Sequence, residues 1–199
     1  IEAKYSIKAY ECPLLSDAEI EEIAQKYPII RQAMGINQYA SLIRSPFYIN
    51  LLVISISDIN NIKDVNEFRN YIWTNIICIK NISNRYNLKS NEIVDTVNYI
   101  VMERAKKFLV GIHTDRLQTD ILEALKSEGV VIESNHTVRL KYDIFEDICF
   151  ENYFDIQFDE CRGDYNSFFG SIESLGRCVY RRYQIWVSNK ILAKPNREK

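Results

Sequence analysis

The chain has 199 residues, a formal net charge of −2, and thirteen tyrosines and nine phenylalanines against six glycines and four prolines. This length allows one large or two small domains with a real hydrophobic core, and the composition excludes an intrinsically disordered chain. A charge close to zero argues against a general electrostatic attraction to nucleic acid or to anionic membranes. No run approaches the roughly 20 apolar residues of a membrane span, and no signal peptide is visible, so no membrane partner is expected.

Short helices are predicted along the first half of the chain. Ser16 and Glu19 have the spacing of a capping box that opens a helix ending near Pro28. Ser45 and Pro46 supply the N-cap and the first residue of another helix, over residues 46–52. Further helices are expected at about 38–44, 65–80 and 91–108, with a polar loop at 57–64. The inward positions of the last two helices are Val65, Phe68, Ile72, Ile76, Ile79, Val94, Val97, Val101, Ala105 and Phe108.

A polar helix followed by a two-stranded ribbon is predicted in the middle of the chain. Thr114 can cap a helix over 115–128, and Gly129 ends it. The apolar positions of this helix are Leu117, Ile121, Leu122 and Leu125. Residues 130–134 and 138–142 then alternate as half-buried strands.

The register of this ribbon depends on the length of its turn. A two-residue turn at 135–136 would set Ile132 opposite Arg139, and it lacks the glycine that tight hairpins favour. A three-residue loop at 135–137 sets Ile132 opposite Leu140 and Glu133 opposite Arg139, so that like faces like and opposite charges pair. We therefore predict the three-residue loop.

The last third of the chain is again predicted to be helical. Asp143 and Glu146 have capping-box spacing and open an apolar helix that runs to about Asp159. A break follows near Gly163, and a final helix or helix pair extends to Leu192. The predicted fold class is mainly α: a helical subdomain at 1–85, a winged helix-turn-helix with a short β-ribbon at 86–160, and a C-terminal helical extension at 161–199.

The cysteines and histidines give no sign of a metal site or a disulfide framework. The five cysteines are widely spaced without a CxxC pair, and only two histidines could serve as imidazole ligands. This usage favours a reduced, cytoplasmic setting with the cysteines acting as small buried side chains. Because the chain opens at Ile1 with a segment that reads as a continuation, we expect a fragment of a longer polypeptide.

No catalytic constellation is predicted. The six glycines stand alone, so neither a P-loop nor a dinucleotide fingerprint can be written. Residues 51–58 resemble a Walker B strand only superficially, and a buried helix with its turn is the simpler interpretation. His113 and His136 are interpreted as exposed or capping residues rather than catalytic bases. No catalytic or metal residue is assigned.

Nucleic-acid binding through the predicted 115–128 helix is disfavoured by its charge. Four acidic residues outnumber Arg116 and Lys126 there, and residues 135–137 at the ribbon tip contain neither Lys nor Arg. A basic cluster on the last helix is interpreted as a solvated face or a partner contact. It comprises Arg177, Arg181, Arg182 and Lys190, interleaved with Tyr180, Tyr183 and Trp186.

Two segments together resemble one protein class. Residues 41–52 (SLIRSPFYINLL) resemble the L-x-x-P-F-x-L-x-L-L helix in the lid of the STAND signal-transduction ATPases, AAA+-type P-loop proteins that include the NACHT and NB-ARC proteins. Residues 121–130 (ILEALKSEGV) and 138–146 (VRLKYDIFE) resemble the winged helix of that class, where the pattern ends in F-x-H-D-x-F-x-E. The resemblance covers residues 16–160.

The resemblance implies nucleotide contacts that need a core from elsewhere. In that class the lid proline packs near the nucleotide base, which corresponds to Pro46, and the winged-helix His-Asp pair, which reads the ADP phosphates, corresponds to Tyr142 and Asp143. Tyr142 stands where histidine is expected; it can donate a hydrogen bond but offers no titratable cation. ATP or ADP is implied only for the parent protein, whose nucleotide-binding core, the expected partner, would precede Ile1. This chain alone is therefore expected to hydrolyse nothing.

Three functional hypotheses follow. The first is a regulatory lid and winged helix of a STAND-like ATPase, which couples nucleotide state to domain movement and exposes an apolar surface where the core docks. The second is a winged-helix DNA-binding transcriptional regulator. The third is a helical protein-interaction module without a nucleotide.

Overall fold

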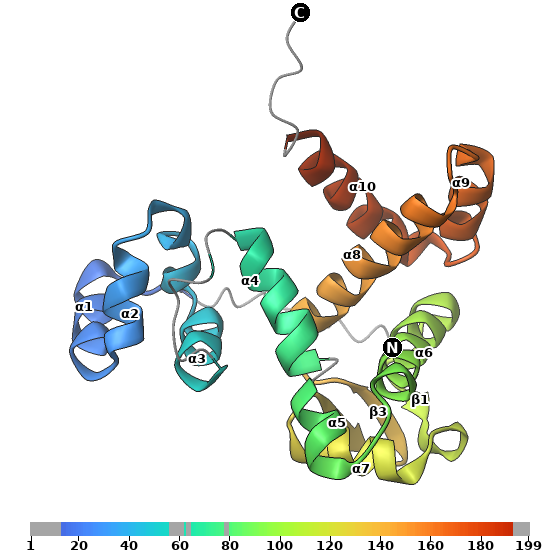
Figure 1. Cartoon of the computed structure of the whole chain (residues 1–199), viewed down its shortest axis with the longest axis horizontal. Helices are drawn as coiled ribbons and strands as arrows, with labels where there is room; N and C mark the ends of the chain where they lie inside the picture. The colour runs from blue at the N-terminus through green and yellow to red at the C-terminus, as the bar shows by residue number, and fades with distance from the viewer. Residues whose placement is uncertain (1–12, 56–61, 63–64, 78–79, 193–199) are drawn as a thin grey trace, which may run out of the picture. The chain divides into compact units, whose positions relative to one another are not determined.

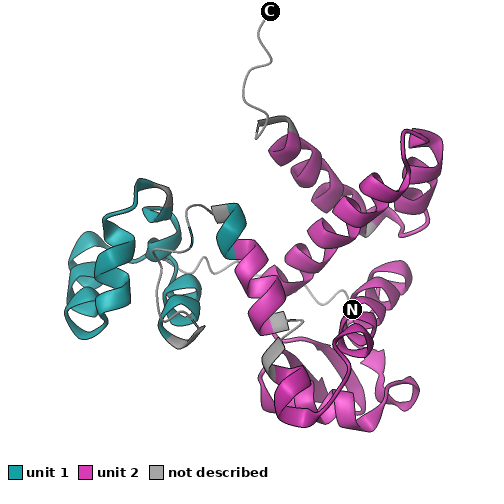
Figure 2. Cartoon of the chain, viewed as in Figure 1, with its two compact units in different colours: residues 1–68 teal, residues 69–199 magenta. Residues whose placement is uncertain are grey.

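The computed structural model describes residues 13–55, 62, 65–77 and 80–192, and the chain divides into two compact units, residues 1–68 and 69–199 (Figures 1 and 2). Most described residues are helical and their one sheet is small and antiparallel, which confirms the predicted mainly α fold with a short β-ribbon. Within the described residues, no helix is both long and apolar enough to cross a membrane. Several predicted features lie outside the described residues: Cys12, Cys78, Ile79, the tail 193–199, the loop 57–64 apart from Ile62, and the side chain of Val65.

Unit 1 consists of short helices around buried aliphatic side chains and Tyr39. Its elements are α1 (Asp17–Lys26), α2 (Pro28–Met34), the 3-10 turns η1 (Asn37–Tyr39) and η2 (Leu42–Arg44), and α3 (Pro46–Ser55). The capping box is confirmed, because Ser16 and Glu19 exchange both side-chain bonds. The predicted helix over 38–44 is wrong: two separate 3-10 turns occupy this region. The Tyr39 ring is fully buried, and its hydroxyl donates to the Ile62 carbonyl at 3.0 Å, which ties the end of η1 to Ile62.

The predicted helix over 65–80 is interrupted. Helix α4 (Val65–Ile72) passes into a π-helical turn, η4 (Trp73–Ile77), and α5 (Lys80–Tyr86) follows. The Asn75 amide donates to the Tyr71 carbonyl at 3.1 Å, a side-chain bond that competes with the helix backbone. A π turn widens the helix and shifts the face of later residues, so Phe68 and Ile72 are buried whereas Ile76 is only half-buried.

Helix α6 (Ser90–Lys107) is the longest predicted helix of the first half, and its boundaries are close to those expected. Its buried residues are Ile93, Val97, Ile100, Val101 and Met102. The inward assignment of Phe108 is wrong: this residue leaves the helix with a left-handed backbone, at φ 54°, and is 71% exposed. Phe108, Leu109 and Val110 thus form an exposed apolar turn, with Val110 at 83% exposure.

The sheet of unit 2 has the strand order β1-β3-β2, with β1 (Ile112–His113), β2 (Val131–Ser134) and β3 (Thr137–Leu140). A 3-10 turn, η5 (Thr114–Arg116), and helix α7 (Thr119–Ser127) lie between β1 and β2. The predicted cap at Thr114 is wrong, because α7 begins only at Thr119 with Gln118 as its N-cap. Thr114 lies in η5, and its amide donates to the His136 carbonyl at 3.1 Å, which prolongs the β1–β3 pairing. Gly129 ends the helix as predicted, with φ at 69°.

The predicted hairpin register is wrong. Ile132 pairs with Arg139 and Val131 with Leu140, so the turn has two residues, Asn135 and His136. Both have left-handed backbones, at φ 50° and 57°, as a type I′ turn requires. This register buries Val131, Val138 and Leu140 together and leaves Ile132 outside. The free energy gained by burying this strand face outweighs the strain of a turn without glycine and the loss of the predicted Glu133–Arg139 pair.

Helices α8 (Asp143–Glu160), α9 (Tyr165–Glu173) and α10 (Arg177–Leu192) complete unit 2. Gly163 and Gly176 have positive φ values, 94° and 82°, at the two helix breaks, so a helix pair follows the predicted break. The predicted capping box of Asp143 and Glu146 is wrong: Asp143 is already helical, and the N-cap, Tyr142, makes no side-chain cap bond.

The compact units divide earlier than the sequence suggests. The division after residue 85 groups α5 with the first part of the chain, whereas α5 packs against α6 and α7 within unit 2. Whether 1–85, 86–160 and 161–199 are independent folding units stays a prediction.

Candidate functional site

The structure brings two of the three predicted site residues together. Tyr142 and Asp143 are consecutive at the amino end of α8 in unit 2. Pro46 is the first residue of α3 in unit 1 and is exposed. The site is therefore built here from the amino end of α8 and the residues that pack around it.

The ring of Tyr142 is held between two neighbours. Its edge contacts the ring of Phe145, with centroids 5.3 Å apart and planes at 89°, and the Lys141 ammonium lies 5.2 Å above its centroid. Phe145 is buried in the core, so this contact ties the helix N-cap to the interior. Asp143, on the next position, is exposed in the first turn of the helix, where a negative charge interacts favourably with the helix dipole.

Glu146 is the buried centre of a charge network, which we call the α8 ion network: Arg104, Glu146, Asp147 and Arg182. Glu146 is only 5% exposed. One carboxylate oxygen pairs with Arg104 of α6, and the other lies 3.6 Å from a guanidinium nitrogen of Arg182 of α10. Arg182 also donates to Asp147 at 2.6 Å. Three helices are thus joined at one buried carboxylate.

Both arginines make further contacts that fix their positions. The Arg104 Nε atom donates to the Leu109 carbonyl at 3.1 Å, which anchors the exposed apolar turn to the network. The Arg182 guanidinium lies 5.1 Å from the ring centroid of Phe150, a cation–π contact. These planar, multiply bonded groups are oriented more strongly than a lysine would be.

Burial is the main influence on the charge of Arg104 and lowers its pKa below the ordinary value. The Asp143 carboxylate opposes this effect, and the positive charges of Arg139 and Arg182 add to it. The positive charges that α6 and α10 bring to the amino end of α8 are paired there with the carboxylates of Glu146 and Asp147.

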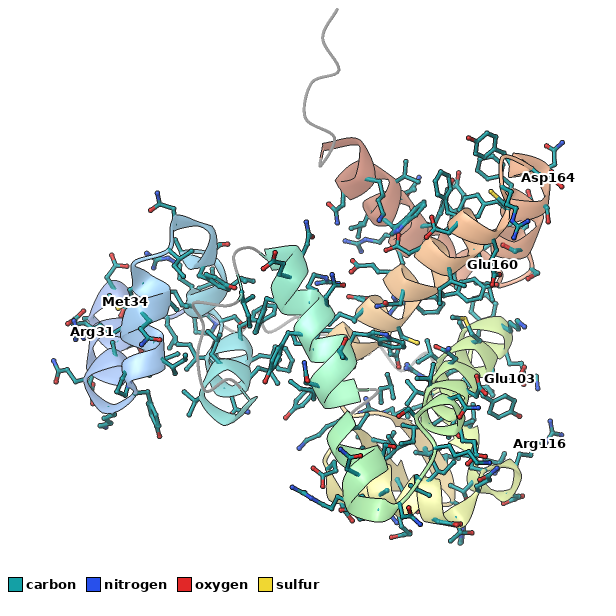
Figure 3. The ribbon with its side chains drawn as sticks, viewed as in Figure 1. Arg31, Met34, Glu103, Arg116, Glu160 and Asp164 are labelled. Carbon is teal, nitrogen blue, oxygen red and sulfur yellow. The ribbon has the colours of Figure 1, made fainter. Side chains whose placement is uncertain are left out.

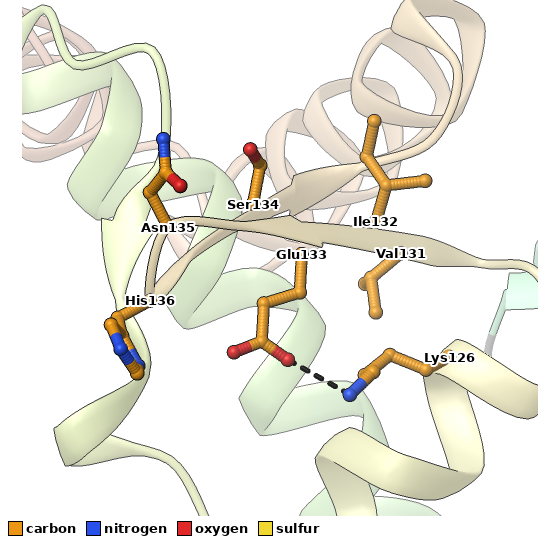
Figure 4. A pocket seen from close by; sticks show the side chains of 7 residues that line it. All are labelled: Lys126, Val131, Ile132, Glu133, Ser134, Asn135 and His136. Carbon is orange, nitrogen blue, oxygen red and sulfur yellow. Dashed lines mark hydrogen bonds and ion pairs between the residues drawn. The ribbon is translucent and has the colours of Figure 1, made fainter.

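The ribbon face is a second place where chemistry could occur. A shallow hollow of about 620 Å³ there is lined by residues of β2, the turn and Lys126 of α7 (Figure 4). Lys126 pairs with both Glu123 and Glu133 at 2.8 Å, and these bonds raise its pKa to about 12. The Arg116 pKa is likewise raised, chiefly by a hydrogen bond to Tyr99. Both cations of the predicted recognition element are thus engaged within the protein.

The predicted basic cluster on the last helix is only partly a solvated face. Arg177 and Arg181 are exposed, but Arg182 belongs to the α8 ion network, and Lys190 lies 2.7 Å from Asp155. Trp186 is nearly buried and donates to Asp155 at 2.7 Å. The sequence pattern missed the network because its partners come from three helices distant in the chain.

Among the described residues, no group of three or more His, Cys, Asp or Glu side chains could hold a metal ion. Cys149 is a buried thiol that donates to the Asn98 amide oxygen at 3.0 Å, and Cys161 is a half-buried thiol; neither is in a disulfide. Comparison of the chain with protein families, with curated proteins and with solved structures finds no match.

Proposed function

We propose that residues 16–160 are the lid and winged helix of a STAND-like ATPase, a regulatory segment that closes on a nucleotide held by an upstream core. The observation that supports the proposal is the element order α6-β1-η5-α7-β2-β3-α8 with sheet order β1-β3-β2, an order that the winged-helix hypothesis expects. In the proposal, Tyr142 and Asp143, at the start of the helix after the ribbon, correspond to the phosphate-reading His-Asp pair of the class.

The exposed apolar turn at Phe108, Leu109 and Val110 supports a docking role. Three consecutive apolar side chains, each at least 40% exposed, are unfavourable on a surface that stays in water. Phe108 is also held in a left-handed backbone that costs a non-glycine residue about 1 kcal/mol or more. In the proposal this turn contacts the nucleotide-binding core in the closed state.

The α8 ion network supplies the mechanical part of the proposal. It joins the start of α8, which would face the nucleotide, to α6 and α10 through one buried carboxylate. Its bond to the Leu109 carbonyl continues to the docking turn. A change in nucleotide state at Tyr142 and Asp143 would therefore be transmitted through packed, hydrogen-bonded groups rather than through a mobile loop.

The first test is the reading frame upstream of Ile1. A GxxxxGK[ST] motif within about 300 residues is expected. If none is present, the proposal is withdrawn. In the second test, the upstream segment is co-expressed with the full chain, and co-purification of the two polypeptides is measured in the presence of ADP.

The second test has matched variants. Val110→Asp places a charge on the proposed contact and should abolish retention, whereas Ile185→Asp, at an apolar residue of α10 with 48% exposure, should not. Equal loss with both variants, or with neither, contradicts docking through the turn.

DNA binding is a weaker alternative on the same fold. Phosphate binding depends on clustered cations, whereas Lys126 is shared between two carboxylates and the predicted 115–128 helix holds more acidic than basic residues. Salt-dependent binding of duplex DNA that is lost in Lys126→Ala and Arg116→Ala would favour this alternative over the regulatory segment.

A further inference from the structure

A groove lined by aromatic side chains lies between α8, α9 and α10 in unit 2, outside the winged-helix elements. Its volume is about 570 Å³, within the range of small-molecule sites, which is roughly 300–1,000 Å³. Figure 3 marks the nearby turn from α8 to α9 with Glu160 and Asp164, both acidic. The aromatic lining comprises Phe158, Tyr165, Phe168, Phe169, Tyr183 and Trp186.

The rings form a buried floor with an exposed rim. Phe168 and Trp186, with centroids 5.8 Å apart, are nearly buried and belong to the floor. Phe158, Tyr165 and Phe169 are between 42% and 53% exposed and form the rim. The floor contributes to packing of the three helices, whereas the rim rings bury about half of their surface in the fold and leave the rest exposed. That exposed surface is open to a ligand.

The groove already holds one ammonium group of the chain itself. The Lys190 Nζ atom lies 5.8 Å from the Trp186 ring centroid and 2.7 Å from an Asp155 carboxylate oxygen. The same oxygen accepts the Trp186 indole N–H at 2.7 Å. An aromatic face next to a carboxylate is the combination that binds organic cations, and this corner of the groove demonstrates it.

A second carboxylate lines the groove without such a cation. Asp159 is exposed and has no hydrogen-bond or ion-pair partner among the described residues. It lines the same groove as the exposed rings of Tyr165 and Phe169. The groove thus contains a second carboxylate with exposed aromatic rings, but no ammonium group in the described part of the chain pairs with Asp159 as Lys190 pairs with Asp155.

We propose that this groove binds a small organic ammonium ion, with its alkyl groups against the rim rings and its charge facing Asp159. The groove size fits a single small molecule. Electrostatic attraction to the ring faces and to the carboxylate would act together, whereas a neutral ligand of the same shape would have only apolar contact. The inference is independent of the proposed nucleotide coupling.

The test is a titration of the full chain with choline, and with its uncharged isostere 3,3-dimethylbutanol as the matched control. Trp186 fluorescence reports binding in a Trp73→Phe background, since the chain has two tryptophans. Saturable binding of choline in the millimolar range is expected, at least about threefold tighter than the isostere. Equal binding of both compounds, or no saturation by choline up to about 50 mM, overturns the proposal.

Variants locate the site and keep the test independent of folding. Asp159→Asn and Phe169→Ala should each weaken choline binding about threefold, with an unchanged circular dichroism spectrum. Glu173→Gln and Tyr27→Ala change an exposed acid and an exposed ring outside the groove and should have no effect. A uniform effect of all four variants overturns the location.

Lys190→Met gives a result of opposite sign. Removing the internal ammonium frees Asp155 and the Trp186 face, so choline should bind about threefold tighter. Weaker binding in this variant would show that Lys190 supports the groove rather than occupying it, and would contradict the proposal.

Discussion

Replacing Glu146 with Gln removes the negative charge from the α8 ion network while keeping the size of the side chain. Arg104 and Arg182 would then retain their charges in a site where their side chains are only 22% and 28% exposed. Breaking a buried pair by removing one partner costs about 3–5 kcal/mol, and the partial exposure of the arginines places this case near 3 kcal/mol. Asp147 still neutralises part of the Arg182 charge, which also favours the lower value.

The assay is equilibrium unfolding in urea, followed by circular dichroism. With an m-value of about 2 kcal/mol/M, a loss of 3 kcal/mol lowers the midpoint by about 1.5 M. Glu160→Gln, an exposed change on the same helix, should shift stability by less than about 0.5 kcal/mol. The combined replacement Arg104→Met with Glu146→Leu should recover most of the loss, because an apolar pair avoids the buried charges. If Glu146→Gln behaves like Glu160→Gln, the reasoning about the network is refuted.

Three further predictions can be checked by the same unfolding measurement. Burial raises the pKa of Glu151 despite the nearby Arg69, so the folded state keeps this carboxyl protonated above the ordinary glutamate pKa of about 4.3. The free energy of unfolding should therefore fall as pH rises through the folded pKa, and Glu151→Gln should remove that fall. A variant with the same pH profile as the unchanged protein would contradict this prediction. His136→Gly should stabilise the hairpin by about 0.5–1 kcal/mol, because glycine adopts the left-handed turn backbone without strain, and a loss of stability would argue against the two-residue turn. Gly111→Ala should destabilise by about 1–3 kcal/mol, because the added Cβ would lie 3.0 Å from the Val138 carbonyl oxygen, and a neutral result would mean that the strand can shift.

Local signals in the sequence were sufficient where one residue type determines one backbone geometry. The capping box at Ser16, the helix end at Gly129 and the break near Gly163 depend on neighbours within a few residues, and the structure has them where the sequence placed them. The mainly α class follows from the same kind of local periodicity.

The wrong predictions concern places where contacts between residues distant in sequence outweighed a local preference. Thr114 has the residue type of a helix cap, but β-pairing holds its amide on the His136 carbonyl, and α7 begins only at Thr119. The hairpin register was predicted from cross-strand pairs, whereas burial of Val131 with Leu140 set it and forced two non-glycine residues into left-handed backbones. Tertiary burial outweighed the turn preference in this case.

The candidate site shows the same limit. The position of Tyr142 and Asp143 at a helix start could be predicted from the order of the ribbon and the helix. The burial of Glu146 could not, because it depends on arginines from α6 and α10 whose approach is a property of the assembled unit. A capping role was the reasonable local interpretation of a carboxylate in a first helical turn.

Helix α10 contributes residues both to the α8 ion network and to the aromatic groove. Arg182, in the α8 ion network, and Trp186, in the floor of the aromatic groove, are four residues apart and so lie on one side of the helix, a single turn from each other. Any rotation of α10 that opens or closes the groove must also move the Arg182 guanidinium relative to Glu146 and Asp147. If ligand binding in the groove changes the stability of the α8 ion network through this rotation, thermodynamic linkage requires that a change at the network alters the ligand affinity of the groove by the same free energy.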